Sequence, residues 1–306
     1  MTIGIPRAFL YYRYHALWIT FLEALGCEVV ISRPTDKKIL TQGQMLAIDE
    51  ACLSSKVYLG HVQSLIGKCD AILVPRISNF GRREILCTKF EGLFDVTSNV
   101  FRDQNVNIID YNVDLRKNAN ELSGFLALGK KLGKKQHLCL YAYMMAKQAE
   151  RAEHERQIDK QNLLLEKDGI KILVVGHSYN VYDEYVGRPV LDALKSLSTT
   201  PIIADICDRR IAHERSFEIT ESLPWAFNRE LVGAVQEYRN RVHGMILLSA
   251  FPCGPDALVN DILIRRVKDL PTVTLLMDAQ EGTAGIETRL ESFVDIIRWK
   301  LDEVDN

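Results

Sequence analysis

The chain has no long apolar run and almost no net charge. No stretch approaches the roughly 18 consecutive apolar residues of a membrane-spanning helix. A formal net charge of −2 over 306 residues gives no basic surface of the kind that nucleic acid requires. The first residues, Met1–Pro6, lack the basic head and apolar middle of a signal peptide. We therefore expect a cytoplasmic protein that binds neither nucleic acid nor a membrane.

Closely paired cysteines are also missing. The seven cysteines are odd in number, and no two form a Cys-x-x-Cys pair. Secreted disulfide frameworks and structural zinc sites both depend on such regular pairing. These absences disfavour a disulfide scaffold and leave zinc as the weaker alternative for any metal site.

Glycine-rich nucleotide-binding motifs are absent as well. No Gly-x-Gly-x-x-Gly string follows either opening strand of the two halves described below. Such strings bring backbone amides close to a diphosphate. We therefore do not expect this chain to bind a dinucleotide in the usual way or to hydrolyse ATP.

Short apolar runs alternate with amphipathic segments along the whole chain. The apolar runs after the first strand of each half are Glu28–Ile31, Ala71–Val74, Val106–Ile109, Pro201–Ala204, Met245–Leu248 and Val273–Met277. This alternation predicts parallel sheets with helices on both faces. We predict an α/β protein with two flavodoxin- or Rossmann-like domains whose sheets face a central cleft.

The chain reads as two similar halves. A strand at Ile3–Pro6 precedes a helix over about 12–25, and a strand at Ile172–Gly176 precedes a helix over about 188–197. Between them, residues 134–167 contain neither glycine nor proline, which predicts a long helix. We predict an N-terminal domain over 1–133, a bridging helix over 134–169 and a C-terminal domain over 170–306, with the boundary near Asp168–Lys171.

Three cysteines lie where a strand or loop is expected to lead into a helix. They are Cys52, Cys87 and Cys253, and Cys253 is bracketed by Pro252 and by Gly254-Pro255. The N-terminus of a helix carries a partial positive charge and unpaired N–H groups, which favour thiolate over thiol. Thiolates bind metals. These three positions are therefore candidate metal ligands.

The sequence around the other four cysteines does not mark them as metal ligands in the same way. Cys27 and Cys69 flank short strands, and Cys139 lies in an apolar helix. Because free cysteine is among the most buried residue types, we expect these three to be structural. Cys207 follows a strand and could approach the same cleft, so its role stays open.

Five strings recur in the order of a known family: Gly4–Arg7, Glu50–Cys52 with Gly60–Val62, Cys87–Phe90, Gly176–Asp183 and Phe251–Asp256. Together they resemble the iron–sulfur proteins of the 2-hydroxyacyl-CoA dehydratase superfamily. The nearest branch comprises proteins found beside, or fused to, the dehydratase activator ATPase. The resemblance implies paired flavodoxin-like domains and a 4Fe–4S cluster held by Cys52, Cys87 and Cys253.

The resemblance also implies a function. In the dehydratases, the iron without a protein ligand helps to expel a hydroxyl after one-electron reduction of an acyl-CoA thioester. A separate activator ATPase supplies the electron, and the substrate-binding part can include a second dehydratase-like subunit. We therefore expect low-potential electron transfer or reductive dehydration, the latter a lyase reaction.

Two departures from the family pattern bear on activity. Gln280 and Thr283 stand where the family carries histidine and glutamate, and Leu53 replaces a proline after the first cysteine. They leave the cysteines untouched but weaken the argument for dehydration. A non-enzymatic module that scaffolds or delivers clusters, or that couples to the activator, is the alternative.

Around such a cluster, the sequence places Arg7, His61, Arg76, His177 and Tyr179 in the cleft. Arginine could hold an anionic ligand, and Arg7, His61 and His177 are the candidate catalytic residues, with a histidine giving a proton to the departing hydroxide. In the alternative interpretation, His61 and His177 cap helices and tune the cluster potential through hydrogen bonds. Both interpretations stay open on the sequence alone.

Overall fold

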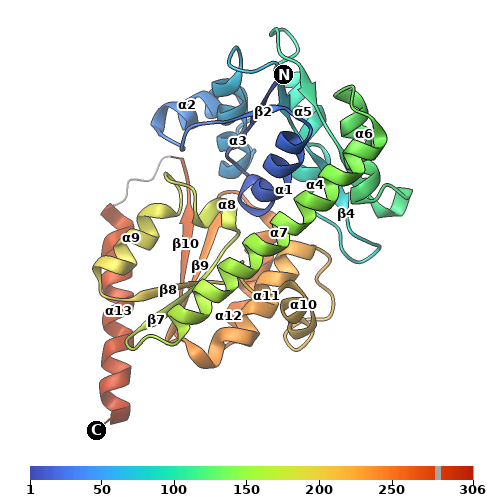
Figure 1. The fold of residues 1–306 in the computed structure, drawn as a ribbon. Coiled ribbons are helices and arrows are strands. Elements are labelled where there is room, and N and C mark those ends of the chain that lie inside the picture. The colour runs from blue at the N-terminus through green and yellow to red at the C-terminus, as the bar shows by residue number, and fades with distance from the viewer. Residues whose placement is uncertain (280–283, 306) are drawn as a thin grey trace. The chain divides into compact units, whose positions relative to one another are not determined.

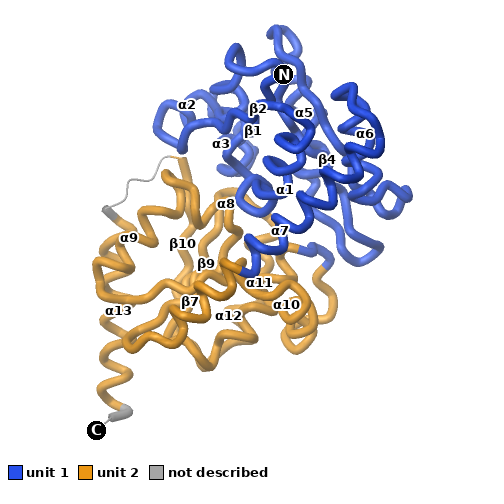
Figure 2. Tube along the Cα trace, in the orientation of Figure 1, with its two compact units in different colours: residues 1–155, 224–226 blue, residues 156–223, 227–306 orange. Residues whose placement is uncertain are grey.

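The chain divides into two compact units, which Figure 2 shows in different colours. A computed structural model describes residues 1–279 and 284–305. Unit 1 comprises Met1–Glu155 and Pro224–Ala226, and unit 2 comprises Arg156–Leu223 and Phe227–Asn306. Each unit contains a four-stranded sheet in which every pairing is parallel. The predicted α/β class with two parallel sheets is confirmed.

The sheet of unit 1 has the strand order β2-β1-β3-β5. Its strands are β1 (Thr2–Ile5), β2 (Glu28–Ile31), β3 (Ala71–Leu73) and β5 (Ile108–Ile109). The helices of the connections are α1 (Tyr11–Ala24), α2 (Lys37–Leu46), α3 (Leu53–Leu65), α4 (Thr88–Glu91) and α5 (Leu93–Val100). An order that begins 2-1-3 is the flavodoxin-like arrangement, in which ligands collect beyond the carboxyl ends of the strands.

A small second sheet extends unit 1. It pairs β4 (Arg76–Asn79) with β6 (Asn112–Asp114) in parallel, and a short 3-10 turn, η1 (Leu115–Lys117), precedes α6 (Glu121–Lys131). The loop between β4 and α4 contains Cys87. This sheet therefore fixes the segment that leads to one candidate ligand.

The helix α7 (Gln136–Leu165) is 30 residues long and runs from unit 1 into unit 2 (Figure 1). It occupies the segment in which the sequence predicts a long helix. The division between the units falls inside it, between Glu155 and Arg156, whereas the sequence analysis places the domain boundary near Asp168. Among the described residues, no helix combines the length and apolar character needed to cross a membrane.

The sheet of unit 2 has the strand order β10-β9-β7-β8. Its strands are β7 (Lys171–Val175), β8 (Thr200–Ile203), β9 (Gly244–Ala250) and β10 (Thr272–Met277). All seven residues of β9 are buried, as expected of a central strand covered on both faces. The helical segments are α8 (Ser178–Val181), α9 (Arg188–Ser196), α10 (Arg209–Ser216), α11 (Ala226–Tyr238), η2 (Arg239–Arg241), α12 (Gly254–Arg266) and α13 (Ala284–Asp305).

Candidate functional site

The three candidate ligands all begin helices. Cys52, Cys87 and Cys253 are the residues that cap α3, α4 and α12, and each is half-buried. None of them caps its helix with a side-chain hydrogen bond to the backbone. Cys52 Sγ lies 3.2 Å from Ser55 Oγ, and Cys253 hydrogen-bonds the Asp256 carboxylate, so two of the sulfurs contact the first turn of their own helix. The predicted placement at helix starts is confirmed.

Their role as metal ligands stays a prediction. Cys52 and Cys87 belong to unit 1, and Cys253 belongs to unit 2. Within the part of the chain that the structure describes, no group of three or more His, Cys, Asp or Glu side chains is placed to hold a metal ion. The donor chemistry nevertheless suits iron, because cysteine thiolates are the usual protein ligands of iron–sulfur clusters.

The remaining cysteines are poorer ligands. Cys27, Cys139 and Cys207 are buried, and Cys69 Sγ donates to the Leu65 carbonyl at 3.5 Å. Burial raises the pKa of Cys69 and of Cys139, and it raises the pKa of Cys207 to about 11. A thiol with a raised pKa stays protonated near neutral pH. Cys207, which the sequence left open, therefore falls with the structural cysteines.

One aromatic side chain packs against both of the helices that begin at Cys52 and Cys87. The ring of Phe9 lies 5.3 Å from that of Tyr58 in α3 and 5.1 Å from that of Phe90 in α4, measured between centroids. All three side chains are buried. Phe9 has a φ of 48°, an uncommon value for a bulky residue, which surrounding packing must hold in place. Phe9 thus packs against both of the ligand-bearing helices of unit 1.

The helix α3 is also fixed by a close crossing with α2. A Cβ atom added at Gly43 would lie 1.7 Å from the Lys56 carbonyl oxygen, and one added at Gly60 would lie 2.0 Å from that of Ile39. The two backbones therefore approach more closely than any side chain allows. This crossing explains the glycine of the Gly60-His61-Val62 string.

The loop before Cys87 is held by a distant segment of the chain. The Ile85 N–H donates to the Pro224 carbonyl at 3.1 Å, and the Ala226 N–H donates to the Ile85 carbonyl at 2.9 Å. This is a parallel bridge to Pro224–Ala226, the part of the second half that belongs to unit 1. The position of one candidate ligand therefore depends on residues far along the sequence.

His61 is fully buried inside α3 and does not cap a helix. Its Nδ1 lies 2.8 Å from Ser32 Oγ, and its Nε2 lies 2.8 Å from Thr35 Oγ1. Burial, helped by the nearby Arg7, lowers the pKa of His61 to about 3. The ring is therefore neutral at ordinary pH, which favours a structural role over proton donation.

Arg7 lies just beyond the carboxyl end of β1. Its backbone N–H donates to Ser32 Oγ at 2.7 Å, so Ser32 connects Arg7 to His61. This brings two of the sequence-predicted site residues together at the carboxyl edge of the unit 1 sheet, where ligands bind in such folds. Ser32 and Thr35 were not predicted, because neither belongs to a recognisable motif.

His177 precedes α8 but does not cap it with its side chain. Its ring stacks on Tyr179, with centroids 5.0 Å apart and planes 13° from parallel. Its Nε2 lies 3.1 Å from Asp256 Oδ1, which also accepts a hydrogen bond from Asn228 Nδ2 at 2.8 Å. Asp256 is in the first turn of α12, the helix that Cys253 begins. His177 is thus attached to the helix of the third candidate ligand.

Opposing effects set the ionisation of Asp256. Burial alone would raise its pKa, but the charge and hydrogen bond of His177, with hydrogen bonds from Asn228 and Cys253, bring the pKa below its ordinary value. The carboxylate is therefore the favoured form. Asp256 lies in the Phe251–Asp256 string, which does not by itself indicate a role for it. An acidic residue in the first helical turn is the signal that could have identified it.

Two further sequence predictions concern Arg76 and the C-terminal segment. Arg76 donates to both carboxylate oxygens of Asp95, at 2.6 and 2.7 Å, and lies over the Phe94 ring. Its guanidinium is thus already engaged within unit 1. Gln280 and Thr283 lie outside the described residues.

The fold and the cysteine positions define a two-unit α/β protein with thiols at the starts of helices. The sequence model of the family described as the CoA enzyme activase uncharacterised domain (DUF2229) matches residues 2–207. The chain belongs to this family. A search of the curated proteins gave no match. The matched residues include Cys52, Cys87 and His177 but not Cys253 or Asp256.

Proposed function

We propose that this protein is an iron–sulfur protein whose 4Fe–4S cluster is held by Cys52, Cys87 and Cys253. The observation that carries the proposal is that all three are half-buried residues at the starts of helices. When bound, such a cluster supplies low-potential one-electron chemistry and, with three protein ligands, one iron that is open to an exogenous oxygen ligand. The reduced thiols that this requires fit a cytoplasmic location.

The family description connects the chain to CoA enzyme activases. We therefore propose an activator ATPase as the electron donor, with transfer onward or reductive dehydration of a 2-hydroxyacyl-CoA as the outcome. In dehydration, a second dehydratase-like subunit would complete the substrate site. The side chain of Arg7 would bind an anionic group, and His177, oriented by Asp256, would be the proton donor. His61, which is neutral and bonded at both nitrogens, would support α3.

The proposal is tested by purifying the chain without oxygen and measuring iron and acid-labile sulfide. We expect about four of each per chain. The variants Cys52→Ser, Cys87→Ser and Cys253→Ser should each lose the cluster. Cys69→Ser is the matched control, because Cys69 is also half-buried, and it should retain the cluster. Stoichiometric zinc without sulfide would contradict the proposal.

A non-enzymatic cluster scaffold is the second candidate. The neutral, fully bonded His61 favours it, because it removes one proton donor from the dehydratase interpretation. The loaded protein would be incubated with activator, ATP, reductant and a panel of 2-hydroxyacyl-CoA thioesters. Enoyl-CoA would support dehydration, and activator-dependent reduction without enoyl-CoA would support electron transfer. Transfer of the cluster to an apo-acceptor, with neither of these, would support the scaffold.

A further inference from the structure

Unit 2 contains a pocket of about 440 Å³ whose charged lining is entirely basic. Arg156 and Lys160 come from α7, and Arg188 and Lys195 come from α9. Among the described lining residues there is no aspartate or glutamate. Four cations around one concavity contrast with the net charge of −2 of the whole chain. Such a wall concentrates positive potential and attracts anions.

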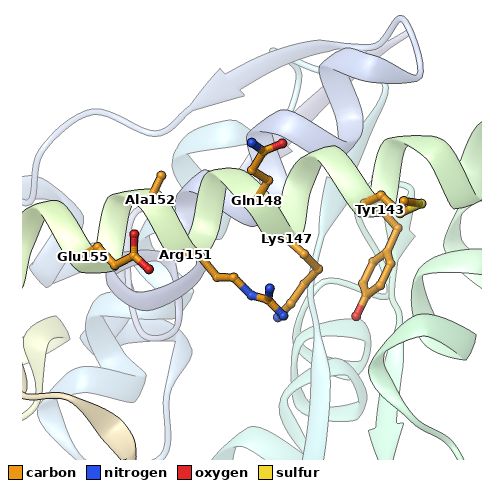
Figure 3. A pocket seen from close by; sticks show the side chains of 7 residues that line it. Tyr143, Lys147, Gln148, Arg151, Ala152 and Glu155 are labelled. Carbon is orange, nitrogen blue, oxygen red and sulfur yellow. The ribbon is translucent and has the colours of Figure 1, made fainter.

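Two other concavities among the described residues do not share this character. The groove along α7 in unit 1 is lined by the acidic Glu155 as well as by Lys147 and Arg151 (Figure 3). The pocket between α9 and α13 is lined by Asp192, Glu287 and Glu291. The basic lining therefore distinguishes the pocket beside β8 from its neighbours.

The floor of this pocket is apolar and partly aromatic. Leu164, Leu191 and Ile203 contribute aliphatic surface, and Tyr182 contributes a half-buried ring. Burial raises the pKa of Tyr182 above its ordinary value, so its hydroxyl stays uncharged. Basic groups around an apolar floor suit a ligand with two parts, an anionic group and a flat ring.

The wall formed by α7 is fixed to the sheet by one buried side chain. Gln161 Nε2 donates to the carbonyls of Ile203 at 3.0 Å and Ile206 at 2.7 Å, and Gln161 Oε1 accepts from the Ile203 N–H at 2.8 Å. Its amide therefore bonds the open edge of β8 as a neighbouring strand would. Arg156 and Lys160, on the same helix, are held in place by this connection.

Two of the lining cations, Arg188 and Lys195, form ion pairs with Asp192 that solvent reaches. Asp192 pairs with Arg188 at 3.3 Å and with Lys195 at 3.7 Å, but all three side chains are exposed. Exposed pairs of this kind are weak and exchange readily with other partners. Asp205 accepts hydrogen bonds from the backbone and hydroxyl of Ser178.

We propose that this pocket binds a ligand that joins a phosphate chain to a flat aromatic ring, as nucleotides do. The phosphates would lie against Lys160, Arg188 and Lys195, and the ring would lie on Tyr182 and Leu191. Recognition would rest on basic side chains rather than on a glycine-rich loop, which the sequence lacks. The site lies wholly within unit 2, and it does not depend on the cluster proposed above.

Isothermal titration calorimetry of the full chain tests this proposal with ADP, CoA and inorganic pyrophosphate as probes. We expect ADP or CoA to saturate one site per chain below about 1 mM and to bind at least about tenfold more tightly than pyrophosphate. Their relative affinities would show whether a simple nucleotide or the nucleotide end of CoA is preferred. Affinity should fall as salt rises, because exposed charges are screened.

Neutralising the basic wall should weaken binding selectively. Lys160→Gln/Lys195→Gln should lower the affinity for the better probe at least about tenfold. Lys268→Gln/Lys300→Gln, which removes two exposed charges of unit 2 outside the pocket, should leave it within about twofold. Tyr182→Ala should weaken binding of the nucleotide but not of pyrophosphate. No saturation by ADP or CoA, or equal binding by both double variants, would overturn the proposal.

Discussion

Nε2 of His177 lies 3.1 Å from Oδ1 of Asp256, and both side chains are buried. The histidine follows β7, whereas the aspartate belongs to α12, so the contact joins segments that are distant in the sequence. A buried carboxylate is stable only when hydrogen-bond donors surround it. The pair therefore fixes both the ring orientation of His177 and the first turn after Cys253.

Asp256→Asn should weaken unit 2, because it removes the charge that His177 and Asn228 stabilise. We expect the free energy of unfolding, measured with denaturant, to fall by about 1–3 kcal/mol. Asp261→Asn is the matched control on the same helix. It breaks only an exposed pair with Arg265, and it should change stability by less than about 0.5 kcal/mol. A double-mutant cycle with His177→Ala that shows no coupling would contradict the pairing.

Phe9→Ala should lower the stability of unit 1, because the Phe9 ring packs against both α3 and α4. Removing a buried aromatic ring lowers the free energy of unfolding by about 3–5 kcal/mol. Any backbone strain that is released at this position reduces that loss. Denaturant unfolding measures this loss. Trp299→Ala removes a ring that is 61% exposed and should change stability by less than about 0.5 kcal/mol. Equal effects of the two variants would show that Phe9 does not hold the two helices together.

Gly60→Ala should destabilise the protein although alanine is the better helix former. The gain in helix propensity is about 1 kcal/mol, whereas forcing α2 and α3 apart costs about 1–3 kcal/mol or more. A Cβ atom added at Gly285 in α13 meets no atom of the described residues within 4 Å, so Gly285→Ala should raise the stability instead. Thermal unfolding of both variants distinguishes a helix crossing from a simple propensity effect: a higher melting temperature for Gly60→Ala would show that the backbones are not in contact.

His61 should make stability depend on pH. Its pKa is about 3 in the folded protein and about 6.5 when unfolded, so the unfolded chain binds more protons between these values. The stability that neutral His61 contributes is therefore fully present above about pH 6.5 and is lost as the pH falls towards 3. At pH 5 the loss from this residue is about 2 kcal/mol.

Comparing the wild type with His61→Gln isolates this contribution. Burial also lowers the pKa of His243, but that residue is present in both proteins. Denaturant unfolding at pH 7.5 and pH 5 should show a smaller pH-dependent loss in the variant. The same loss in both proteins would mean that His61 is protonated in the folded state.

The sequence was informative where the signal was local. The strand β2 was predicted with its observed bounds, and the prolines and glycine around Cys253 indicated the start of α12. Hydrophobic alternation marks a buried strand, and helix starts carry their own residue preferences, so both can be recognised without a partner.

The contacts that define the candidate site were not predictable in the same way. Ser32 and Thr35 reach His61 from other segments, and the bridge from Pro224–Ala226 to Ile85 joins the two halves of the sequence. The spacing of residues along the sequence does not predict such contacts, because they depend on how the connections between strands bring the strand ends together. The neutral state of His61 follows from these contacts and could not be seen earlier.

The hydrogen bonds between Gln161 and Ile203 link the hydrogen exchange of one backbone amide at the edge of the sheet to a side chain of α7. An amide at an open edge normally exchanges its hydrogen with solvent quickly, but the Ile203 N–H is bound to Gln161. Its exchange therefore requires the Gln161 side chain to leave the edge of β8. The exchange rate of this single amide thus reports how often the contact between Gln161 of α7 and the edge of β8 opens, without any label being introduced.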